Sequence, residues 1–325
     1  YEAMPVAHSE PPELTEDQRR ALDAMLPSLT AGNGAFLLNG VTGSGKTEVY
    51  LALAQRALQL GKAAIILVPE IALTPQMVGW FRERFGPRTA VLHSRLTDGQ
   101  RLDEWRRIRQ GDARVVVGAR SAVFAPVERL GLIVIDEEHE QTYLSDHHPR
   151  YDARRVAQSR CTREGATLLL SSATPSILSF AMARRGDYTL VEMPCRVHNR
   201  PMPAVTVVDM RKELAAGNRS IFSLLLQQRL KVCFERGQQA MLFLNRRGYN
   251  TFVSCRNCGY VVKCRQCDVS MTLHQLEGHA EGELRCHFCG ATAQPPTVCP
   301  ECGSKYIRYF GSGTQKVEEE LHRLF

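Results

Sequence analysis

The sequence has no apolar run near the roughly 18 residues that a membrane-spanning helix needs. Residues 1–12 are polar and interrupted by proline, so they lack the apolar centre of a secretory signal. Long internal repeats and low-complexity tracts are also missing. These absences predict a soluble, cytoplasmic protein without a membrane partner. Because the chain opens on Tyr1 rather than Met, we expect residues 1–13 to be a linker from a missing N-terminal region.

The length and the cysteine content of the chain are informative. Its 325 residues, 44% of them hydrophobic, suffice for two ordinary cores. Eight of the 11 cysteines fall in Cys-x-x-Cys pairs, a spacing that favours thiolate metal ligation in a reducing compartment over disulfides. The pairs are Cys255 and Cys258, Cys264 and Cys267, Cys286 and Cys289, and Cys299 and Cys302. They predict two closed, structural Zn²⁺ sites of four cysteines each.

The spacing leaves open how the four pairs combine. We favour a nested grouping, in which the first pair joins the last and the second joins the third, so that one ion closes the base of the insertion and the other its tip. His274, His279 and His287 are alternative ligands. We expect them at the surface or in turns, because the sulfurs suffice.

Net charge says little about a nucleic-acid partner. The formal charge is +7, but a four-thiolate zinc site carries a net charge of −2, so two such sites would lower the total to +3. Any electrostatic footprint must therefore be local. The candidates are Arg101, Arg106, Arg107 and Arg109, or the pair Arg154 and Arg155.

The segment from Gly40 to Thr47 reads Gly-Val-Thr-Gly-Ser-Gly-Lys-Thr, the pattern of a phosphate-binding P-loop. Its glycines allow backbone N–H groups to wrap phosphates at a helix N-terminus. Lys46 would bind the phosphates and Thr47 would ligate Mg²⁺. The pattern also arises by chance, but here it follows an expected strand and precedes a helical pattern, as the function requires. The predicted nucleotide-binding set is Gly40, Gly43, Ser44, Gly45, Lys46 and Thr47.

Asp136 and Glu137 follow the apolar run Leu132–Ile135, at the end of a strand where a parallel sheet presents ligand groups. Asp136 would hold Mg²⁺, and Glu137 would orient and deprotonate the attacking water. An acidic pair after a strand is also common as a solvated turn. The P-loop upstream favours catalysis, so the predicted catalytic set is Lys46, Asp136 and Glu137, and the predicted reaction is nucleotide hydrolysis.

Gln18 has a structural and a functional interpretation. Thr15 and Gln18 form a capping-box pattern that would open a helix over Glu16–Leu26. Gln18 is also a candidate contact to the adenine edge, which would make the protein prefer ATP. The cap is expected, and the adenine contact stays open.

Short apolar runs alternate with helix-period segments over residues 14–193, which predicts an α/β lobe with a doubly wound parallel sheet. Residues 194–203 contain three prolines and are expected to link this lobe to a second one. The expected strands are Ala35–Leu38, Ala64–Val68, Thr89–Leu92, Arg114–Val117, Leu132–Ile135 and Thr167–Leu170.

Beyond the linker, a helix over Leu224–Glu235 and a buried strand over Gln239–Leu244 predict that a second α/β lobe begins. The cysteine-rich segment interrupts it, and a loop leading into a helix follows from Gly311. The predicted divisions are residues 204–254 for the start of the second lobe, 255–302 for the zinc-binding insertion and 303–325 for a truncated continuation.

In this order the motifs resemble those of superfamily-two helicases with RecA-like lobes, and the inserted Cys-x-x-Cys pairs resemble those of the bacterial PriA family in particular. The resemblance covers about Leu14 to Phe325. It implies an ATP-driven DNA helicase that moves 3′ to 5′ and acts at stalled forks in replication restart and primosome assembly. The segments that support it are Gly40–Tyr50, Val68–Gln76, Gly118–Ala122, Asp136–His139, Ser172–Ser176 and Leu242–Tyr249.

The resemblance also implies ligands and partners. The ligands are ATP, Mg²⁺ and two Zn²⁺. The partners are forked and single-stranded DNA, the single-stranded-DNA-binding protein, other primosome proteins and the replicative helicase. The family is bacterial and cytoplasmic, and we expect a monomer.

By the same resemblance, further residues would contact DNA or couple it to the nucleotide. Pro69, Thr74, Gly118 and Arg120 would line the single-strand path, chiefly through phosphate contacts. Ser172 and Thr174 would couple the nucleotide state to DNA, and His139 would report across the cleft between the lobes. For Pro69 and Gly118 a purely structural place in a turn or at a strand end is the alternative.

Residues 141–151 occupy the place of the family's aromatic-rich loop, in which base stacking would trigger hydrolysis. Tyr143 and Tyr151 are the candidates for stacking. The loop has no tryptophan and contains Pro149, so a solvated loop with packed aromatics is the alternative.

Several parts of the family pattern are missing from the sequence. We find neither the later second-lobe motifs, with their arginines for the γ-phosphate, nor the N-terminal fork-end-binding and winged-helix domains. We therefore expect this polypeptide to bind ATP and zinc but to hydrolyse ATP poorly and unwind nothing. The rival interpretations are another superfamily-two translocase or an RNA helicase with a zinc insertion, and a non-enzymatic primosome scaffold. The intact catalytic residues argue against a scaffold.

Overall fold

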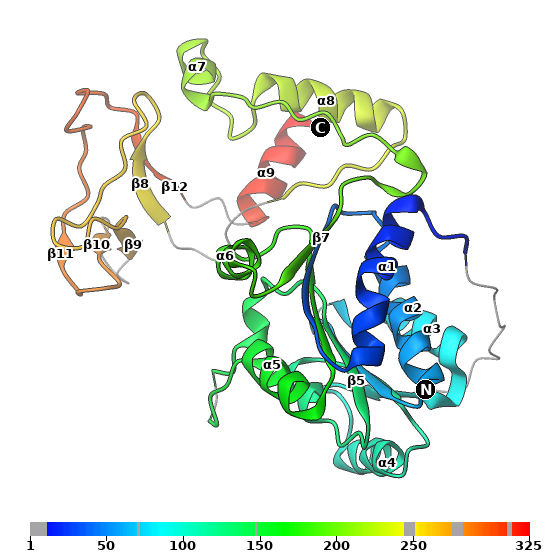
Figure 1. The fold of residues 1–325 in the computed structure, drawn as a ribbon. Coiled ribbons are helices and arrows are strands. Elements are labelled where there is room, and N and C mark those ends of the chain that lie inside the picture. Colours follow the sequence, from blue (N-terminus) through cyan, green and yellow to red (C-terminus); the bar gives the residue numbers. More distant parts are fainter. Residues whose placement is uncertain (1–11, 70–71, 147, 244–250, 275–281, 311–313) are drawn as a thin grey trace. The chain divides into compact units, whose positions relative to one another are not determined.

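A computed structural model describes residues 12–69, 72–146, 148–243, 251–274, 282–310 and 314–325 (Figure 1). The chain divides into two compact units, residues 1–203 and residues 204–325.

The first unit is built on a seven-stranded parallel sheet with the order β3-β4-β2-β5-β6-β1-β7. Six of the strands lie where the sequence predicts them, with ends that differ by no more than two residues. The strands are β1 (Ala35–Gly40), β2 (Ala63–Leu67), β3 (Thr89–Leu92), β4 (Val115–Gly118), β5 (Leu130–Ile135), β6 (Thr167–Ser172) and β7 (Thr189–Met193).

The edge strand β7 is absent from the sequence-based prediction. It pairs with β1 on one side, and only Val191 and Met193 of its five residues are buried. Its sequence therefore lacks the continuous apolar run that marks a strand buried on both faces. Its pairing with β1 places residues 194–200 beside the P-loop, where the Val197 backbone N–H donates to the Gly43 carbonyl at 2.9 Å.

Helices cover both faces of this sheet (Figure 1). One apolar core joins the sheet to α1, α2 and α3, and a second core joins its other face to α4, α5 and α6. Neighbouring residues of one strand serve opposite cores, as Ile65 and Ile66 do, because side chains alternate along a strand. The doubly wound α/β fold is thus confirmed. The helices are α1 (Glu16–Ala31), α2 (Lys46–Gln59), α3 (Pro75–Phe85), α4 (Asp98–Arg109), α5 (Ala153–Glu164) and α6 (Ile177–Arg185).

The second unit contains three described helices and a small antiparallel sheet. The helix predicted over Leu224–Glu235 has those bounds in the structure, and the predicted C-terminal helix is present after Gly311–Gly313, which lie outside the described residues. The sheet order is β11-β10-β9-β8-β12. The elements are α7 (Met210–Ala215), α8 (Leu224–Glu235), α9 (Thr314–Leu324), β8 (Thr251–Cys255), β9 (Thr272–His274), β10 (Glu283–Arg285), β11 (Thr292–Ala293) and β12 (Ile307–Phe310).

The buried strand predicted over Gln239–Leu244 is wrong for its described part. Residues 239–243 belong to no strand, and Met241 and Phe243 are 95% and 87% exposed. A strand needs a neighbour for its backbone hydrogen bonds, and no described residue pairs with this segment. Leu244, with most of the motif Leu242–Tyr249, lies outside the described residues.

Among the described residues, no helix is both long enough and apolar enough to cross a membrane.

Candidate nucleotide site and zinc module

The predicted nucleotide site lies at the carboxyl edge of the central strands. The P-loop follows β1, Asp136 follows β5, and Ser172 ends β6. Strands β5, β6 and β1 are neighbours in the sheet, so their carboxyl ends bring these three segments together although they are far apart in sequence. This edge is where a parallel sheet binds its ligands.

The P-loop needs glycine at its turns. Gly43 and Gly45 have φ angles of +83° and +78°, which disfavour any residue with a side chain. A Cβ on Gly45 would also lie 2.2 Å from Nε2 of Gln18. Lys46 begins α2, and its ammonium donates to the Gly40 carbonyl at 2.9 Å, so its charge lies back over the loop.

Two features of the loop fit a bound phosphate. The Ser44 hydroxyl is buried and has no hydrogen-bond partner among the described residues. No side chain caps the N-terminus of α2, where backbone N–H groups and the helix dipole favour an anion. Phosphate oxygens would supply the missing partners. Thr47 and Asp136 offer the oxygen ligands that Mg²⁺ requires.

Gln18 forms the predicted capping box with Thr15, which is confirmed by both reciprocal hydrogen bonds. Its Nε2 also donates to the carbonyls of Ser44 and Gly45, at 3.2 and 3.3 Å. The amide is buried and ties α1 to the P-loop. Both ends of the amide are thus engaged within the protein, and an adenine contact by Gln18 stays a prediction.

Asp136 is held from two directions by tyrosine hydroxyls. The Tyr50 hydroxyl donates to Oδ1 at 2.7 Å, and the Tyr143 hydroxyl donates to the Asp136 backbone carbonyl at 2.6 Å. Burial raises the pKa of the Asp136 carboxyl, and the hydrogen bond from Tyr50 partly opposes that shift. A divalent cation would favour the charged carboxylate at this position.

Glu137 adopts a left-handed backbone conformation, with φ of 44°, which is unusual for a residue other than glycine. Its Oε2 lies 3.4 Å from the Ser172 hydroxyl and 3.5 Å from Nδ1 of His139. That nitrogen is 2.7 Å from the Ser172 hydroxyl, which also accepts from the Thr174 backbone N–H at 2.9 Å. The structure thus brings four predicted site residues into one hydrogen-bonded group.

Glu138 and Tyr50 are site residues that the sequence analysis missed. Glu138 is fully buried, and its carboxylate accepts from the Ser176 backbone N–H at 2.6 Å and from the Ser179 hydroxyl at 2.8 Å, at the N-terminus of α6. The sequence signal for Glu138 was its place as the second of the two glutamates that follow Asp136. For Tyr50 the signal was its place one helical turn after Lys46, on the same face of α2.

Tyr143 does not fit the predicted base stacking, because only 1% of it is exposed. Its hydroxyl bonds the carbonyls of Leu67 and Asp136, so it anchors the loop to the sheet edge. Tyr151 is partly exposed, with its ring edge-on to Phe124 at 5.0 Å and under the Arg120 guanidinium at 5.6 Å. Packing therefore explains one of the two tyrosines fully and the other in part.

Of the residues expected along the DNA path, Pro69 follows the end of β2, and Gly118 and Arg120 lie at the end of β4, the adjacent strand. Thr74 caps α3 by accepting from the Met77 backbone N–H at 3.2 Å. A Cβ on Gly118 would lie 2.4 Å from the Leu92 carbonyl oxygen, so glycine is required there for packing. Pro69 is buried. These contacts are structural, and DNA contact at these positions stays a prediction.

The eight paired cysteines form two groups, each with all four sulfurs within 4.8 Å of one another. The groups have the nested arrangement: Cys255, Cys258, Cys299 and Cys302, and Cys264, Cys267, Cys286 and Cys289. Sulfur pairs lie 3.6 Å apart, close to the edge of a tetrahedron with metal–sulfur bonds of about 2.3 Å. These geometries support two zinc ions. No histidine of the described residues joins either group, and His279 lies outside them.

The parallel sheet, the P-loop sequence and the acidic pair after β5 are the features of a helicase lobe with a P-loop. The family model for DEAD/DEAH box helicases matches residues 15–181, slightly more than half of the chain, and the chain belongs to that family. A second model, for the Cys-rich region domain of the PriA DNA helicase, matches residues 264–293.

Curated relatives confirm the resemblance to PriA. The chain is 50% identical over all of its 325 residues to the replication restart protein PriA of Bacillus subtilis, of which it covers 40%. It is 48% identical over 322 residues to PriA of Synechocystis, covering 98% of this chain and 38% of that protein. The chain thus spans about two fifths of the length of these relatives.

A solved structure of RecG bound to a three-way DNA junction overlaps 64% of this chain and 29% of its own, with 24% identity and a TM-score of 0.42. This overlap is too low to support an argument about function.

Proposed function

We propose that the chain is the ATP-binding and zinc-binding part of a bacterial replication-restart DNA helicase that moves 3′ to 5′. The observation that best supports this is the convergence of Lys46, Asp136, Glu137 and Ser172 at one edge of the sheet, in a chain whose relatives are replication restart proteins. The direction of movement follows from the family resemblance. The cysteine-rich match separates the chain from helicases that have no zinc module.

The residues at this edge of the sheet have separate roles in ATP hydrolysis. Lys46 and the backbone N–H groups of the P-loop bind the phosphates. Thr47 and Asp136 hold Mg²⁺, which when bound neutralises charge on the phosphate oxygens. Glu137 orients the attacking water and accepts its proton. Tyr50 and Tyr143 keep Asp136 in place while the nucleotide changes.

The group of Glu137, His139, Ser172 and Thr174 couples hydrolysis to DNA. The proposal is supported by the hydrogen bond between His139 and Ser172 and by the contact of both residues with Glu137. A movement of the segment after β6 would therefore directly displace the contacts of the catalytic Glu137.

The proposed partners are forked and single-stranded DNA, the single-stranded-DNA-binding protein, other primosome proteins and the replicative helicase. The proposed setting is the bacterial cytoplasm, with the chain as a monomer. The two zinc ions stabilise the small sheet around β8 to β12, which has a core of its own.

The test measures ATP binding and ATP hydrolysis by residues 1–325, with and without a forked DNA that carries single-stranded arms. Lys46→Ala is the background. We expect ATP binding that is lost in Lys46→Ala, and slow turnover, because the second-lobe arginines were not found and such arginines contribute about 10³ to 10⁵ in rate.

Strong stimulation by DNA would contradict slow turnover but support the helicase assignment. Equal or greater stimulation by RNA would favour an RNA helicase. Unchanged nucleotide affinity in Lys46→Ala would overturn the proposed site.

A further inference from the structure

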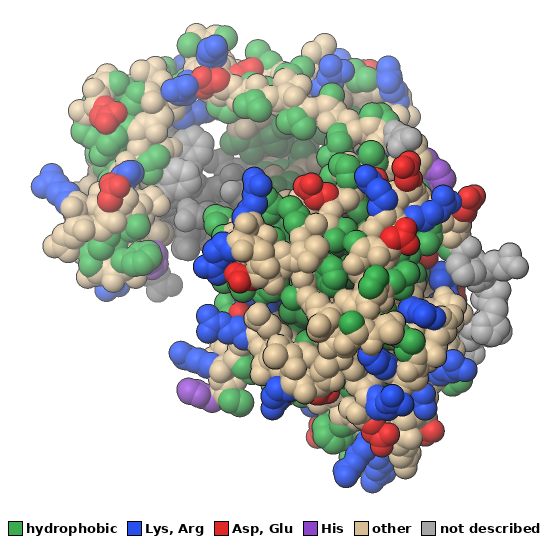
Figure 2. Space-filling view, viewed as in Figure 1, with side chains coloured by type: hydrophobic (Ala, Val, Ile, Leu, Met, Phe, Trp, Pro, Cys, Tyr) green, Lys and Arg blue, Asp and Glu red, His purple; other side chains and the backbone are tan. Residues whose placement is uncertain are grey.

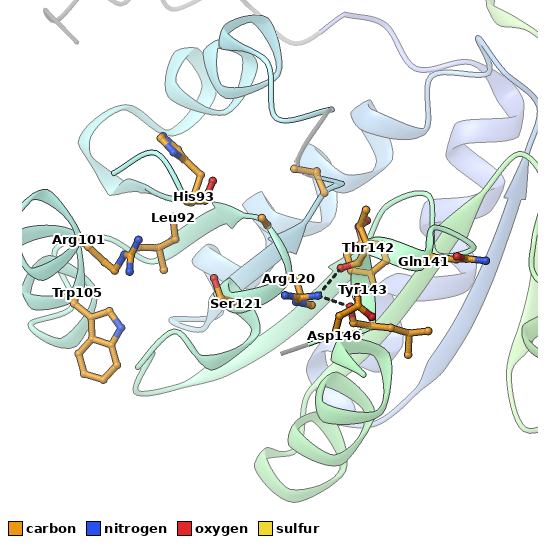
Figure 3. Close-up of a pocket in the computed structure, with 14 residues that line it drawn as sticks. Leu92, His93, Arg101, Trp105, Arg120, Ser121, Gln141, Thr142, Tyr143 and Asp146 are labelled. Atoms are coloured by element: carbon orange, nitrogen blue, oxygen red, sulfur yellow. Dashed lines mark hydrogen bonds between the residues drawn. The ribbon is translucent and has the colours of Figure 1, made fainter. Parts of the chain in front are cut away.

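A pocket of about 590 Å³ lies beside the nucleotide site, at the carboxyl ends of β2, β3 and β4. Arg101 and Trp105 of α4 form one wall (Figure 3). Arg120, Ser121, residues 141–144 and Asp146 form the opposite wall, and Leu92 lies between the two walls. The pocket is large enough for a nucleotide-sized ligand.

Arg101 offers a charge that no described residue neutralises. Its guanidinium makes no hydrogen bond or ion pair with any described residue, and Figure 3 shows it pointing from α4 towards Leu92. Two neighbours on the same helix differ, because Arg106 pairs with Asp103 at 3.8 Å and Arg107 pairs with Glu104 at 2.7 Å. An unpaired guanidinium in a pocket is a site for an anion such as a phosphate.

Arg120 adds a second charge on the opposite wall. Its Nη1 donates to the carbonyls of Thr142 and Leu144, and the guanidinium also lies over the Tyr151 ring. These contacts hold it at the pocket and leave its other nitrogens without a hydrogen bond to a described residue. Asp146, the carboxylate of the pocket, lies on the wall of Arg120 and away from Arg101 (Figure 3). The α4 side is therefore the side for an anion. Lys and Arg side chains, interspersed with acidic ones, cover the surface around α4 (Figure 2).

Trp105 supplies an aromatic surface next to this charge. Arg101 and Trp105 are four residues apart on α4, so their side chains lie on the same face of the helix. Trp105 is 41% exposed although it is a large apolar side chain. An exposed ring beside an unpaired cation is the combination that binds single-stranded nucleic acid, because every base has a face that stacks and every nucleotide carries a phosphate.

We propose that this pocket holds one nucleotide of single-stranded DNA, with its base stacked on Trp105 and an adjoining phosphate bound by Arg101. The inference rests on the proposed DNA-helicase function and adds a contact to it. Since stacking does not read the sequence of the strand, binding should be tolerant of base identity.

The only other tryptophan, Trp80 on α3, provides a matched control, because it is also 41% exposed and does not line the pocket. Binding of a fluorescein-labelled oligo-dT to residues 1–325 is measured by anisotropy. Trp105→Ala should weaken binding by about fivefold or more, as loss of one stacked base does, and Trp80→Ala should leave it unchanged.

Intrinsic tryptophan fluorescence reports directly on stacking of a base on Trp105. In Trp80→Phe, Trp105 is the sole tryptophan, and its emission should be quenched by unlabelled oligo-dT. In Trp105→Phe, which keeps an aromatic ring, the strand should still bind but the remaining emission should not change. Arg101→Gln should lower the slope of log affinity against log salt by about one, and the exposed, ion-paired Arg106→Gln should lower it less.

Wild-type affinity and full quenching in both Trp105 variants would overturn the inference and leave the DNA-helicase proposal standing. Equal competition by a blunt duplex would also overturn it, because paired bases are not free to stack on a side chain. If the wild-type chain binds neither single strands nor forks, the proposed function fails, and the inference fails with it.

Discussion

The hydroxyl of Tyr50 donates a 2.7 Å hydrogen bond to Oδ1 of Asp136, which joins the helix after the P-loop to the end of β5. Tyr50 is one turn after Lys46 on α2, so one helix carries both the lysine predicted to bind phosphate and the group that orients the predicted magnesium ligand. The same hydroxyl lies at hydrogen-bond distance from Ser171 on β6, the next strand of the sheet. A shift of α2 would therefore move the carboxylate of Asp136.

Tyr50→Phe should destabilise the first unit by about 1–3 kcal/mol, because it leaves a partly buried carboxylate oxygen without its donor. Both tryptophans lie in that unit, so their fluorescence during urea unfolding reports its stability. Tyr188→Phe is the control, since Tyr188 is buried but its hydroxyl makes no hydrogen bond to a described residue. Equal losses in the two variants would contradict a specific role for the Tyr50 hydroxyl.

Asp136→Asn should raise the melting temperature of the magnesium-free protein at neutral pH. Burial raises the pKa of Asp136 in the folded state, so folding favours the protonated carboxyl and the ionised form reduces stability above that pKa. Wild-type stability therefore falls as pH rises from the unfolded-state pKa, about 4, through the raised folded-state value. The gain from Asp136→Asn should vanish below about pH 4. Thermal scans at several pH values check this, with the exposed Asp23→Asn as control.

Glu138→Gln should cost about 1–3 kcal/mol of stability, because an amide nitrogen would face the donors of Ser176 and Ser179 in place of a carboxylate oxygen. Urea unfolding with tryptophan fluorescence measures the loss. The exposed Glu83→Gln should change stability by less than about 0.5 kcal/mol. If Glu138→Gln is equally mild, the buried carboxylate does not hold α6 in place.

Zinc content should follow the nested grouping of the cysteines. The wild-type chain should carry two zinc ions by elemental analysis. Cys264→Ser with Cys289→Ser should leave one ion, since both residues belong to one site, whereas Cys264→Ser with Cys258→Ser should leave none. Cys233→Ser, outside both groups, should retain two. Reversed results for the two double variants would refute the grouping.

Periodicity predicted the fold of the first unit because strands buried on both faces must be apolar throughout. An apolar run such as Leu132–Ile135, in a chain with a P-loop upstream, is typical of a strand buried in a parallel sheet. Periodicity did not predict β7, which is only partly buried, and it predicted a strand over Gln239–Leu244, of which residues 239–243 pair with no described residue. In both cases the neighbours of the segment decide its structure, and neighbours far away in the chain leave no local signal.

Some of the candidate site residues could also be predicted from the sequence. Lys46, Asp136 and the cysteine pairs stood out because their spacing has a direct chemical reason. Tyr143 was predicted to stack bases and is buried instead, and Glu138 was passed over although it is the fully buried acid of its motif. A side chain's exposure depends on what packs over it, which spacing does not reveal.

The sequence by itself determined which kinds of ligand are predicted for this protein: phosphate from the glycines and a lysine, metal and water from an acidic pair, and zinc from the thiolate pairs. Local spacing suffices for that, because the phosphate loop, the acidic pair and each Cys-x-x-Cys pair lie within a few residues. Only the tertiary structure decided which groups meet. The order of the parallel strands brings Tyr50, Asp136 and Ser171 into one hydrogen-bonded set, and places Arg101 and Trp105 across a pocket from Arg120. These contacts depend on the order in which the chain places its strands in the sheet. That order is stabilised by the core as a whole rather than by any one segment.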